Sequence, residues 1–401
     1  MRKLTFWASL LFVFVVPWEN VIMFEGGDTF GRLVGIIAAG IWLLAILVTG
    51  QLRVPLPFHV AVFAFMIWNV TSLLWSADPS RTFDRAQTYL QLAILIFMLW
   101  DIYSDPKMVP AALQAYVLGA FITAGSTLYN YLNASEYYYN RYAASGFNPN
   151  DAGLILALGI PLAWHLATEA GEQPAGLLRR TINFLYLPAA LFAIFLTGSR
   201  GTLVAASASF FFILATLLQL RPKLQLLLLG ISLSAAVAVA TMIPPTSVER
   251  ILNKGVTLNG REDVWSQSLA LILERPLLGV GSGATKRVIE AQQSAHNFVL
   301  SIGGETGLIG LALFAFVLFL VFLHAWRNHQ RYRYLWLTML FIWILGASVH
   351  NWEHRKQTWL LFSLVVISSS VAATNVTSLT GPSQVAISSS TALAGKRIGV
   401  H

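Results

Sequence analysis

The chain contains no cysteine among its 401 residues, and only 11% of its residues are charged. The absence of cysteine excludes disulfides, thiol nucleophiles and cysteine metal ligands. Soluble domains carry about 25% charged residues, so this scarcity of charge excludes a soluble globular protein. Hydrophobic residues make up 56% of the chain. Because the apolar runs are roughly 20 residues long, they predict membrane-spanning helices rather than barrel strands.

The apolar runs predict an all-α, polytopic membrane protein with about twelve transmembrane helices. The first run follows three residues, Met1-Arg2-Lys3, and lacks a small-residue cleavage site, so we expect it to be a retained span rather than a signal peptide. The predicted spans are residues 4–18, 35–50, 58–75, 86–103, 109–132, 152–167, 182–197, 202–220, 224–243, 298–326, 335–349 and 358–371.

These spans predict one transmembrane domain, residues 1–375, with one long loop, residues 244–296, between the ninth and tenth spans. Residues 376–401 are rich in Ser, Ala and Thr, and we expect them to form a disordered tail. An even number of spans places both basic chain ends on one side. By the positive-inside rule that side is cytoplasmic, so the tail is cytoplasmic and the long loop lies outside.

The distribution of positive charge does not follow that rule completely. The net charge is +8, with 26 Lys and Arg against 18 Asp and Glu, and half of the basic residues lie outside on this topology. Either the topology is inverted, or the outer face needs cations for chemistry. We favour chemistry, because inversion would expose Arg179 and Arg180 in a short loop. A long loop can escape the rule, but Arg200 lies in a tight turn. Because the charge bias concerns topology first, we expect no nucleic-acid partner.

The sequence Thr197-Gly198-Ser199-Arg200-Gly201 connects two predicted spans. Its small residues allow a tight turn and a close approach by another group. An arginine between apolar helices is costly unless it pairs with an anion. Its planar guanidinium suits phosphate oxygens and does not lose its proton. Alternatively, Arg200 snorkels to the surface or pairs with an acidic side chain.

Arg261 begins a predicted surface helix that Asn259 is placed to cap. An arginine at a helix N-terminus opposes the helix dipole, so it does not serve helix stability. A solvated surface arginine is the alternative. Trp265, Leu269 and Ile272 follow helical spacing and predict an apolar face on the membrane or on the scaffold. The glycine-rich turn Gly279–Gly283 follows no predicted strand, which excludes a dinucleotide-binding motif.

The pair His296-Asn297 lies where the tenth predicted span begins. Histidine can accept a proton near neutral pH, although a lone histidine at a membrane interface is often structural. Nine residues later comes Gly307-Leu308-Ile309-Gly310. Its two glycines share one helical face, which predicts close helix packing and a rigid support for His296. Glu305 lies within this helix and needs a partner.

The segment His350–Lys356 adds polar groups between the last two spans. No HExxH or paired-aspartate pattern is present, so we expect neither a metal nor another cofactor. We expect the carboxylates of Asp263, Glu290, Glu305 and Glu353 to pair with arginines rather than to act as bases.

Together these patterns resemble the O-antigen ligase family of bacterial membrane glycosyltransferases, over residues 75 to 359. The resemblance rests on Thr197–Gly201, on Arg261 followed by Trp265 and Pro276–Gly281, and on His296-Asn297 with the later Gly307–Gly310. Phe147-Asn148-Pro149-Asn150 is a weaker fourth match. The family often has Thr after the last glycine, where this chain has Leu311.

The resemblance implies a metal-independent O-antigen ligase in the bacterial inner membrane, with residues 1–375 as one catalytic domain and its active site facing the periplasm. The donor would be a glycan on undecaprenyl pyrophosphate, and the acceptor a sugar hydroxyl of the lipid A core oligosaccharide, with membrane lipids around both. By analogy, Arg200 and Arg261 bind the pyrophosphate and His296 is the general base of an inverting transfer. The further substrate-binding candidates are Ser199, Asn297, Arg141 and Arg287. Arg141, Arg287 or Lys286 could replace either chosen arginine.

The same motifs also fit an O-antigen polymerase or an oligosaccharyltransferase that modifies pilin or other proteins. The short segment after the last span favours the ligase, because protein-modifying relatives often carry a further C-terminal region. A transporter or lipid flippase is a more remote alternative. Such proteins carry ionisable residues and interrupted helices in mid-membrane, whereas the polar residues here gather on one side.

Overall fold

The computed structural model describes residues 1–25, 27–135, 141–169, 174–219 and 261–379, with isolated positions between 220 and 260. Its named elements are all helices, as the all-α prediction requires. Several predicted features lie outside the described residues apart from isolated positions. These are the ninth span (224–243), residues 244–260 with the predicted cap Asn259, and the part of the tail from residue 380 onward.

Apart from α11 and α12, the described α-helices coincide with predicted spans, and their ends differ from the predicted bounds by up to eight residues. They are α1 (Arg2–Val15), α2 (Phe30–Thr49), α3 (Pro57–Thr71), α4 (Pro79–Ile102), α5 (Met108–Leu132), α6 (Pro149–Glu169), α7 (Pro174–Thr197), α8 (Arg200–Leu217), α11 (Arg261–Glu274), α12 (Thr285–Val288), α13 (Phe298–Arg327), α14 (Gln330–Ala347) and α15 (Lys356–Leu379). The short 3-10 helices η1 (Val16–Trp18) and η2 (Ser72–Trp75) extend α1 and α3.

Seven of the described helical segments are long and apolar enough to cross a membrane, which confirms a multi-pass membrane protein. They are Phe30–Thr49, Pro57–Trp75, Met108–Leu132, Pro149–Glu169, Gly176–Thr197, Arg200–Leu217 and Phe298–Arg327. Helices α1, α4, α14 and α15 coincide with predicted spans without meeting these criteria. The total of twelve spans and the single catalytic domain stay predictions.

Helix α6 is the most enclosed of these segments, and α5, α7, α8 and α14 pack around it. Its sequence has no polar face, and small residues let its neighbours approach. Tyr186 of α7 lies against Gly159, and its hydroxyl donates to the carbonyl of Leu156 at 2.9 Å. This packing holds the first turn of α6, Pro149 to Asp151, in a fixed position at one end of the helix group.

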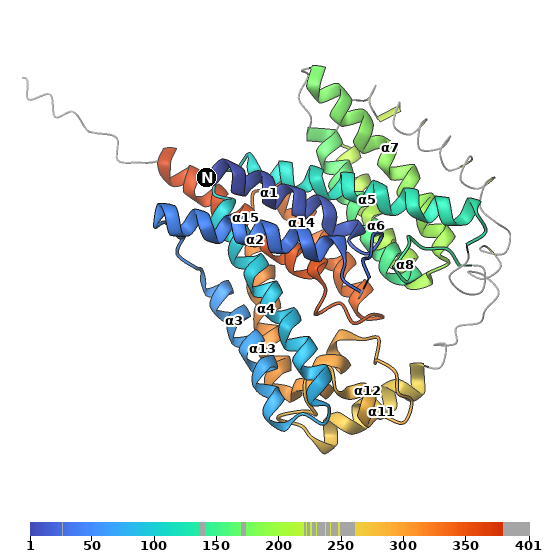
Figure 1. Ribbon diagram of the computed structural model, residues 1–401. Helices are drawn as coiled ribbons and strands as arrows, with labels where there is room; N and C mark the ends of the chain where they lie inside the picture. Colours follow the sequence, from blue (N-terminus) through green and yellow to red (C-terminus); the bar gives the residue numbers. More distant parts are fainter. Residues whose placement is uncertain are drawn as a thin grey trace, which may run out of the picture.

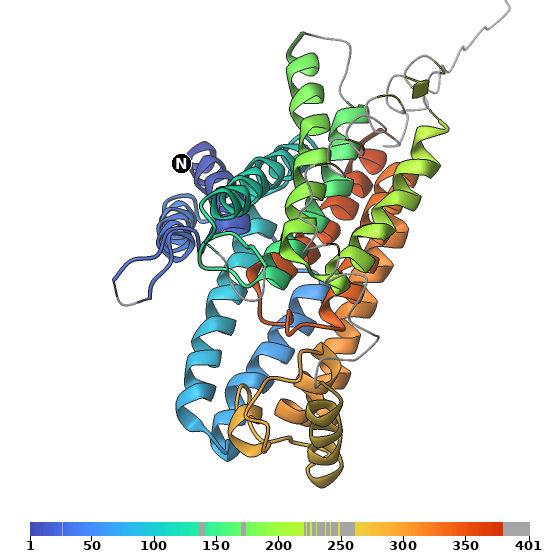
Figure 2. The same ribbon diagram turned by 90° about the vertical axis from the view of Figure 1, so that its right-hand side faces the viewer.

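Helices α3, α4 and α13 lie side by side and extend to one end of the molecule, where α11 and α12 lie (Figure 1). The view turned by 90° shows the same arrangement (Figure 2). Helices α1 and α2 lie beside the opposite end of α4. The N-terminal part of α4 therefore reaches the end that α11 and α12 cover, and its C-terminal end lies near the N-terminus of the chain.

Helix α13 is interrupted, where the sequence predicted a continuous, tightly packed helix. Gly307 has φ 69° and ψ −171°, a conformation that side chains rarely adopt. The break frees backbone groups that the glycine-rich turn uses. Val280 N–H donates to the carbonyl of Gly304 at 3.0 Å, and Leu308 N–H donates to that of Pro276 at 2.7 Å. The glycine at 307 serves this junction, so the prediction that it lies on a helical packing face is wrong.

The buried face of α11 also differs from the prediction. Val264, Ser268 and Leu271 are buried and pack toward α13, whereas Leu269 is exposed. The predicted apolar face was shifted in register because the helix docks onto the interrupted segment of α13, a contact that its own sequence does not encode. Trp265 remains half-buried, and its indole N–H donates to the carbonyl of Ala295 at 2.7 Å. Helix α11 thereby fixes the residue before His296.

Candidate active site

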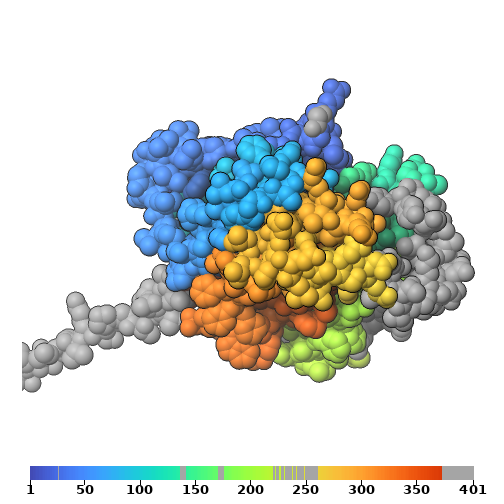
Figure 3. All heavy atoms as spheres, turned by 90° about the horizontal axis from the view of Figure 1, so that it is seen from below, coloured from blue at the N-terminus to red at the C-terminus, as the bar shows by residue number. Residues whose placement is uncertain are grey.

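A polar cavity of about 650 Å³ lies at the end of the molecule that α11 and α12 cover. Figure 3 views this end directly, and the gold-coloured segment of α11 and α12 occupies its centre. The cavity wall comes from α4, α6, the segment before α13, the start of α13 and the loop between α14 and α15. The lining residues are Arg81, Asp84, Arg85, Thr88, Arg141, Asn148, Pro149, Asn150, Asp151, Gly283, Thr285, Lys286, Ser294, Ala295, His296, Ser301, Glu305, His350, Asn351, His354 and Arg355.

The cavity wall is rich in cations. Its basic residues are Arg81, Arg85, Arg141, Lys286 and Arg355, and its acidic residues are Asp84, Asp151 and Glu305. Arg355 donates to Asp151 at 2.9 Å, so that acid is already neutralised. An excess of positive charge in a concave, partly enclosed site favours an anionic ligand.

Asp151 joins the start of α6 to the loop after α14. Its carboxylate accepts hydrogen bonds from Asn148 at 2.6 Å, from the indole of Trp352 at 2.8 Å and from Arg355. The side chain of Asn148 in turn accepts from the backbone N–H of Asn150 and Asp151, both at 2.9 Å. Asn148, from the weaker sequence match, thus lies directly before α6. It helps to hold the carboxylate of Asp151 against the loop after α14.

Arg141 links the predicted arginine turn to the cavity. Its Nε donates to the carbonyl of Thr197 at 2.7 Å, and its Nη2 donates to Oδ1 of Asn150 at 2.6 Å. Ser199 caps α8, because its hydroxyl accepts from the backbone N–H of Thr202 at 3.4 Å. Arg200 is half-buried in the first turn of α8 and is not among the lining residues. Arg141 and its partner Asn150 line the cavity, whereas Ser199 and Arg200 do not.

His296 lies at the cavity wall in a strained backbone conformation. It has φ 48°, in the left-handed region that non-glycine residues rarely adopt, and strain of this kind clusters at functional sites. Burial in the cavity wall lowers the pKa of His296, and the charges of Arg261 and Lys286 lower it further. A lowered pKa keeps the imidazole neutral near pH 7, which is the form that accepts a proton.

Arg261 stands at the first residue of α11 and does not line the cavity, but its charge acts on two of the histidines. It lowers the pKa of His296 and also that of His350, whose pKa burial brings to about 3. Arg261 is itself partly buried, and burial lowers its pKa. The structure thus places Arg261 close enough to His296 for its charge to act on the imidazole, but outside the cavity lining.

Asn297 is the cap of α13. Its Oδ1 accepts from the backbone N–H of Val299 and Leu300, and its Nδ2 donates to the carbonyl of Ser348 at 3.1 Å. Its backbone N–H donates to Oδ1 of Asn351, also at 3.1 Å. These contacts tie His296 to the loop after α14. Asn297 is absent from the cavity lining, so its geometry is that of a positioning residue.

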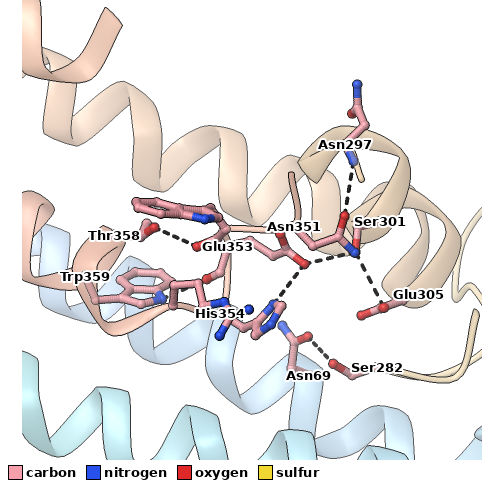
Figure 4. A network of polar contacts seen from close by, with 12 residues as sticks. Asn69, Ser282, Asn297, Ser301, Glu305, Asn351, Glu353, His354, Thr358 and Trp359 are labelled. Carbon is pink, nitrogen blue, oxygen red and sulfur yellow. Dashed lines mark hydrogen bonds and ion pairs between the residues drawn. The ribbon is translucent and has the colours of Figure 1, made fainter. Parts of the chain in front are cut away.

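Figure 4 shows how this cap continues into a buried polar network. Asn351 donates to the hydroxyl of Ser301 at 3.3 Å. That hydroxyl donates to Glu353 at 2.9 Å and lies 3.5 Å from the carboxylate of Glu305. Glu353 also contacts His354 at 3.2 Å. Burial raises the pKa of Glu353, while the charge of Arg85 lowers it. The network therefore couples the interrupted helix α13 to the loop after α14.

The prediction that four carboxylates pair with arginines is only partly correct. Glu305 and Glu353 are buried and interact electrostatically with Arg85 of α4. In the described part of the chain, Asp263 and Glu290 form no ion pair with an arginine, and the acid that pairs with Arg355 is Asp151. The sequence did not single out Asp151, because its partner lies 204 residues away.

Several buried polar atoms of the wall remain open to a ligand. Among the described residues, Nη1 of Arg85, Nε2 of His350 and Nε of Arg355 have no hydrogen-bond partner. Buried polar groups are nearly always hydrogen-bonded, so unpaired ones in a cavity mark places where a polar ligand can bind.

Sequence reasoning found part of this site. His296 and Arg141 line the cavity, Arg261 lies beside it, and exposed Arg287 on α12 does not line it. The sequence analysis missed Arg81 and Arg85. Two arginines one helical turn apart, just before an apolar run, were a usable signal of a cationic site at a helix end. In the described part of the chain, the His, Asp and Glu side chains form no group of three suited to a metal.

The fold and the cavity define a multi-pass membrane protein with a cationic, histidine-containing site at one end of its helices. Residues 185–315 match the family model described as O-Antigen ligase. The chain is 27% identical over 354 residues to an O-antigen ligase of Pseudomonas aeruginosa, covering 84% of each chain. It is also 27% identical over 329 residues to the exopolysaccharide production protein ExoQ of Rhizobium meliloti, covering 76% of this chain and 74% of that protein. These matches confirm the resemblance to the O-antigen ligase family that the sequence motifs indicated.

Proposed function

We propose that the protein is an O-antigen ligase that transfers a glycan from undecaprenyl pyrophosphate to a sugar hydroxyl of the lipid A core oligosaccharide. The observation that carries this proposal is the cavity of about 650 Å³, in which five basic side chains surround a histidine whose pKa is lowered. A pyrophosphate is the anion that such a wall suits, and a neutral histidine suits the activation of a hydroxyl.

In this reaction His296 accepts the proton of the acceptor hydroxyl. The oxygen then attacks the anomeric carbon of the donor glycan, and the bond from that carbon to the pyrophosphate oxygen breaks with inversion. The leaving pyrophosphate carries the electron pair. Arg141 and Arg85, whose side chains line the cavity, stabilise that charge as it develops, and the transfer needs no metal.

Arg200 and Arg261 stay proposed pyrophosphate ligands from outside the cavity wall. Arg261 has support from its electrostatic effect on His296. Arg200 lies beside the wall, because the neighbouring Gly201 packs against Val349 next to His350. Ser199 and Asn297 then position these groups through their helix caps, and Arg287 is an outer candidate on the exposed side of α12.

We place the site on the periplasmic face of the bacterial inner membrane. The support is the clustering of basic residues with His296 at one end of the helices, together with the basic N-terminus at the other end of α4. The polyprenyl donor, the lipid A core and the surrounding lipids are the proposed partners.

A second candidate is a glycan polymerase of the same donor chemistry. The specific observation in its favour is that ExoQ, an exopolysaccharide production protein, is as identical to this chain as the ligase is. A protein oligosaccharyltransferase uses the same donor with a peptide acceptor, and it stays a third possibility.

The test is transfer by the purified full-length protein, without divalent metal, from a lipid-pyrophosphate-linked glycan to rough lipopolysaccharide. The ligase should produce a ladder of glycan-bearing lipopolysaccharide. Longer lipid-linked glycan without that ladder would instead establish a polymerase. Glycosylated peptide, with neither of the other products, would establish a protein-modifying enzyme.

A further inference from the structure

A second basic cavity lies at the opposite end of α4 from the candidate active site. Its volume is about 580 Å³, and Lys3, Arg53 and Asp101 are among its lining residues. Arg81 of the first cavity and Asp101 of the second are separated by twenty residues of one helix, or roughly 30 Å along its axis. That separation matches the thickness of the hydrocarbon core of a bilayer, so the two cavities lie about one bilayer core apart along α4.

Specific hydrogen bonds hold the wall of the second cavity in place. The carboxylate of Asp101 is buried and accepts three hydrogen bonds: from Arg2 at 2.5 Å, from the indole of Trp42 at 3.0 Å and from the backbone N–H of Arg53 at 2.8 Å. Its negative charge is therefore already neutralised by Arg2. The same contacts fix the chain around Arg53 at the end of α2.

Two further cations remain for a ligand. The guanidinium of Arg53 stacks 3.5 Å above the ring of Trp100, and its Nη1 donates to the carbonyls of Trp100 and Tyr103, both at 3.2 Å. Its Nε and Nη2 donate to none of the residues that the structure describes. Within that same part of the chain, exposed Lys3 forms no ion pair. The cavity thus offers one rigid and one flexible cation.

An apolar surface continues from the cavity. Trp7, which lines the cavity, is 63% exposed, and on the same face of α1 Leu4 is 53% and Leu11 is 50% exposed. Residues 4, 7 and 11 follow one stripe of a helix. A ligand with a charged group in the cavity could therefore lay a hydrocarbon chain along α1.

We infer that this cavity binds the phosphate headgroup of an anionic phospholipid of the leaflet opposite the active site, with Lys3 and Arg53 on the phosphate and an acyl chain along Trp7. The charge complementarity and the adjoining apolar stripe favour a lipid over a free phosphate ion, which would need only the cations. Basic pockets at the cytoplasmic ends of transmembrane helices commonly hold such headgroups.

The test uses the full-length protein in mild detergent with equal amounts of phosphatidylglycerol and phosphatidylcholine of the same acyl chains. Native mass spectrometry counts the lipid that stays bound. We expect preferential retention of phosphatidylglycerol, and an affinity about tenfold lower in Lys3→Gln/Arg53→Gln, because each basic group contributes separately to binding an anionic lipid.

Lys107→Gln is the matched control. Lys107 lies between the end of α4 and the start of α5, close in sequence to the cavity, but it is not among the lining residues. An equal loss in this control, equal retention of both lipids, or displacement of the lipid by millimolar inorganic phosphate would each overturn the inference. If the double variant does not fold, Lys3→Gln alone and Arg53→Lys decide the question. The first should weaken binding, and the second should largely preserve it.

Discussion

The backbone N–H of Gly281 donates to the carbonyl of Glu305 at 2.8 Å, which joins the glycine-rich turn to the middle of α13. That carbonyl is free because α13 is interrupted at Gly307. The contact holds Gly283 and Lys286 at the cavity wall on one side and the buried carboxylate of Glu305 on the other. The interruption is thus the junction on which the shape of the candidate active site depends.

Gly307→Ala should destabilise the protein strongly. A Cβ at this position would overlap the carbonyl oxygen of Leu277, and φ 69° is unfavourable for alanine. We expect a loss of at least about 2 kcal/mol, from backbone strain and the displaced turn. Thermal unfolding in detergent measures it. Gly125→Ala is the control, because a Cβ there meets nothing within 4 Å. Equal unfolding temperatures for both variants would disprove the role of the interruption.

His296→Asn should abolish transfer while leaving the fold intact. Asparagine tolerates a positive φ better than most residues, so it keeps the backbone of His296 while removing the base. General-base catalysis contributes about 10²–10⁴-fold, and we expect a rate loss in that range. Gln292→Asn is the control, because Gln292 has the same φ of 48° in the same segment and does not line the cavity. Normal transfer by the histidine variant would exclude the general-base role.

The pH dependence of kcat/KM reports the proton on His296 in the free enzyme. The pKa of His296 is lowered from 6.5, so kcat/KM should be constant at neutral pH and fall below an inflection that lies under 6.5. Arg261→Gln removes a charge that disfavours the protonated ring. The pKa of His296 should rise, and the inflection should move to higher pH. In Arg275→Gln, at the other end of α11, the inflection should stay where it is. A fixed inflection in the Arg261 variant would contradict this assignment.

Arg141→Gln should weaken binding of the lipid-linked donor glycan. Its guanidinium lines the cavity and is held by Thr197 and Asn150, so its position is fixed before the donor binds. A charge-assisted contact to phosphate contributes about 1.5–3 kcal/mol, which corresponds to roughly a tenfold to hundredfold rise in the Kd of the lipid-linked glycan. Titration of the donor into purified protein measures it. Arg275→Gln again provides the exposed control, and an unchanged Kd for Arg141→Gln would remove this residue from the proposed site.

Local features were predictable from the sequence because their causes are local. Apolar runs indicated where the long described helices lie, although not their exact ends, since a run of this length can satisfy its backbone in a membrane only as a helix. The position of His296 was also predictable, because it directly precedes Asn297, the cap residue at the start of an apolar run. The apolar face of α11 was misjudged, because its burial depends on α13 and not on its own spacing.

The sequence by itself determined the membrane-spanning class, the approximate positions of the long described helices and the histidine that precedes α13. The tertiary structure decided which cations share a cavity. Arg85, Arg141 and Arg355 come from three separate parts of the chain, and the partner of Arg355 is 204 residues away. Sequence spacing cannot encode such proximity, because it arises from how whole helices pack around α6 and how the turn at Gly281 docks onto the interrupted helix.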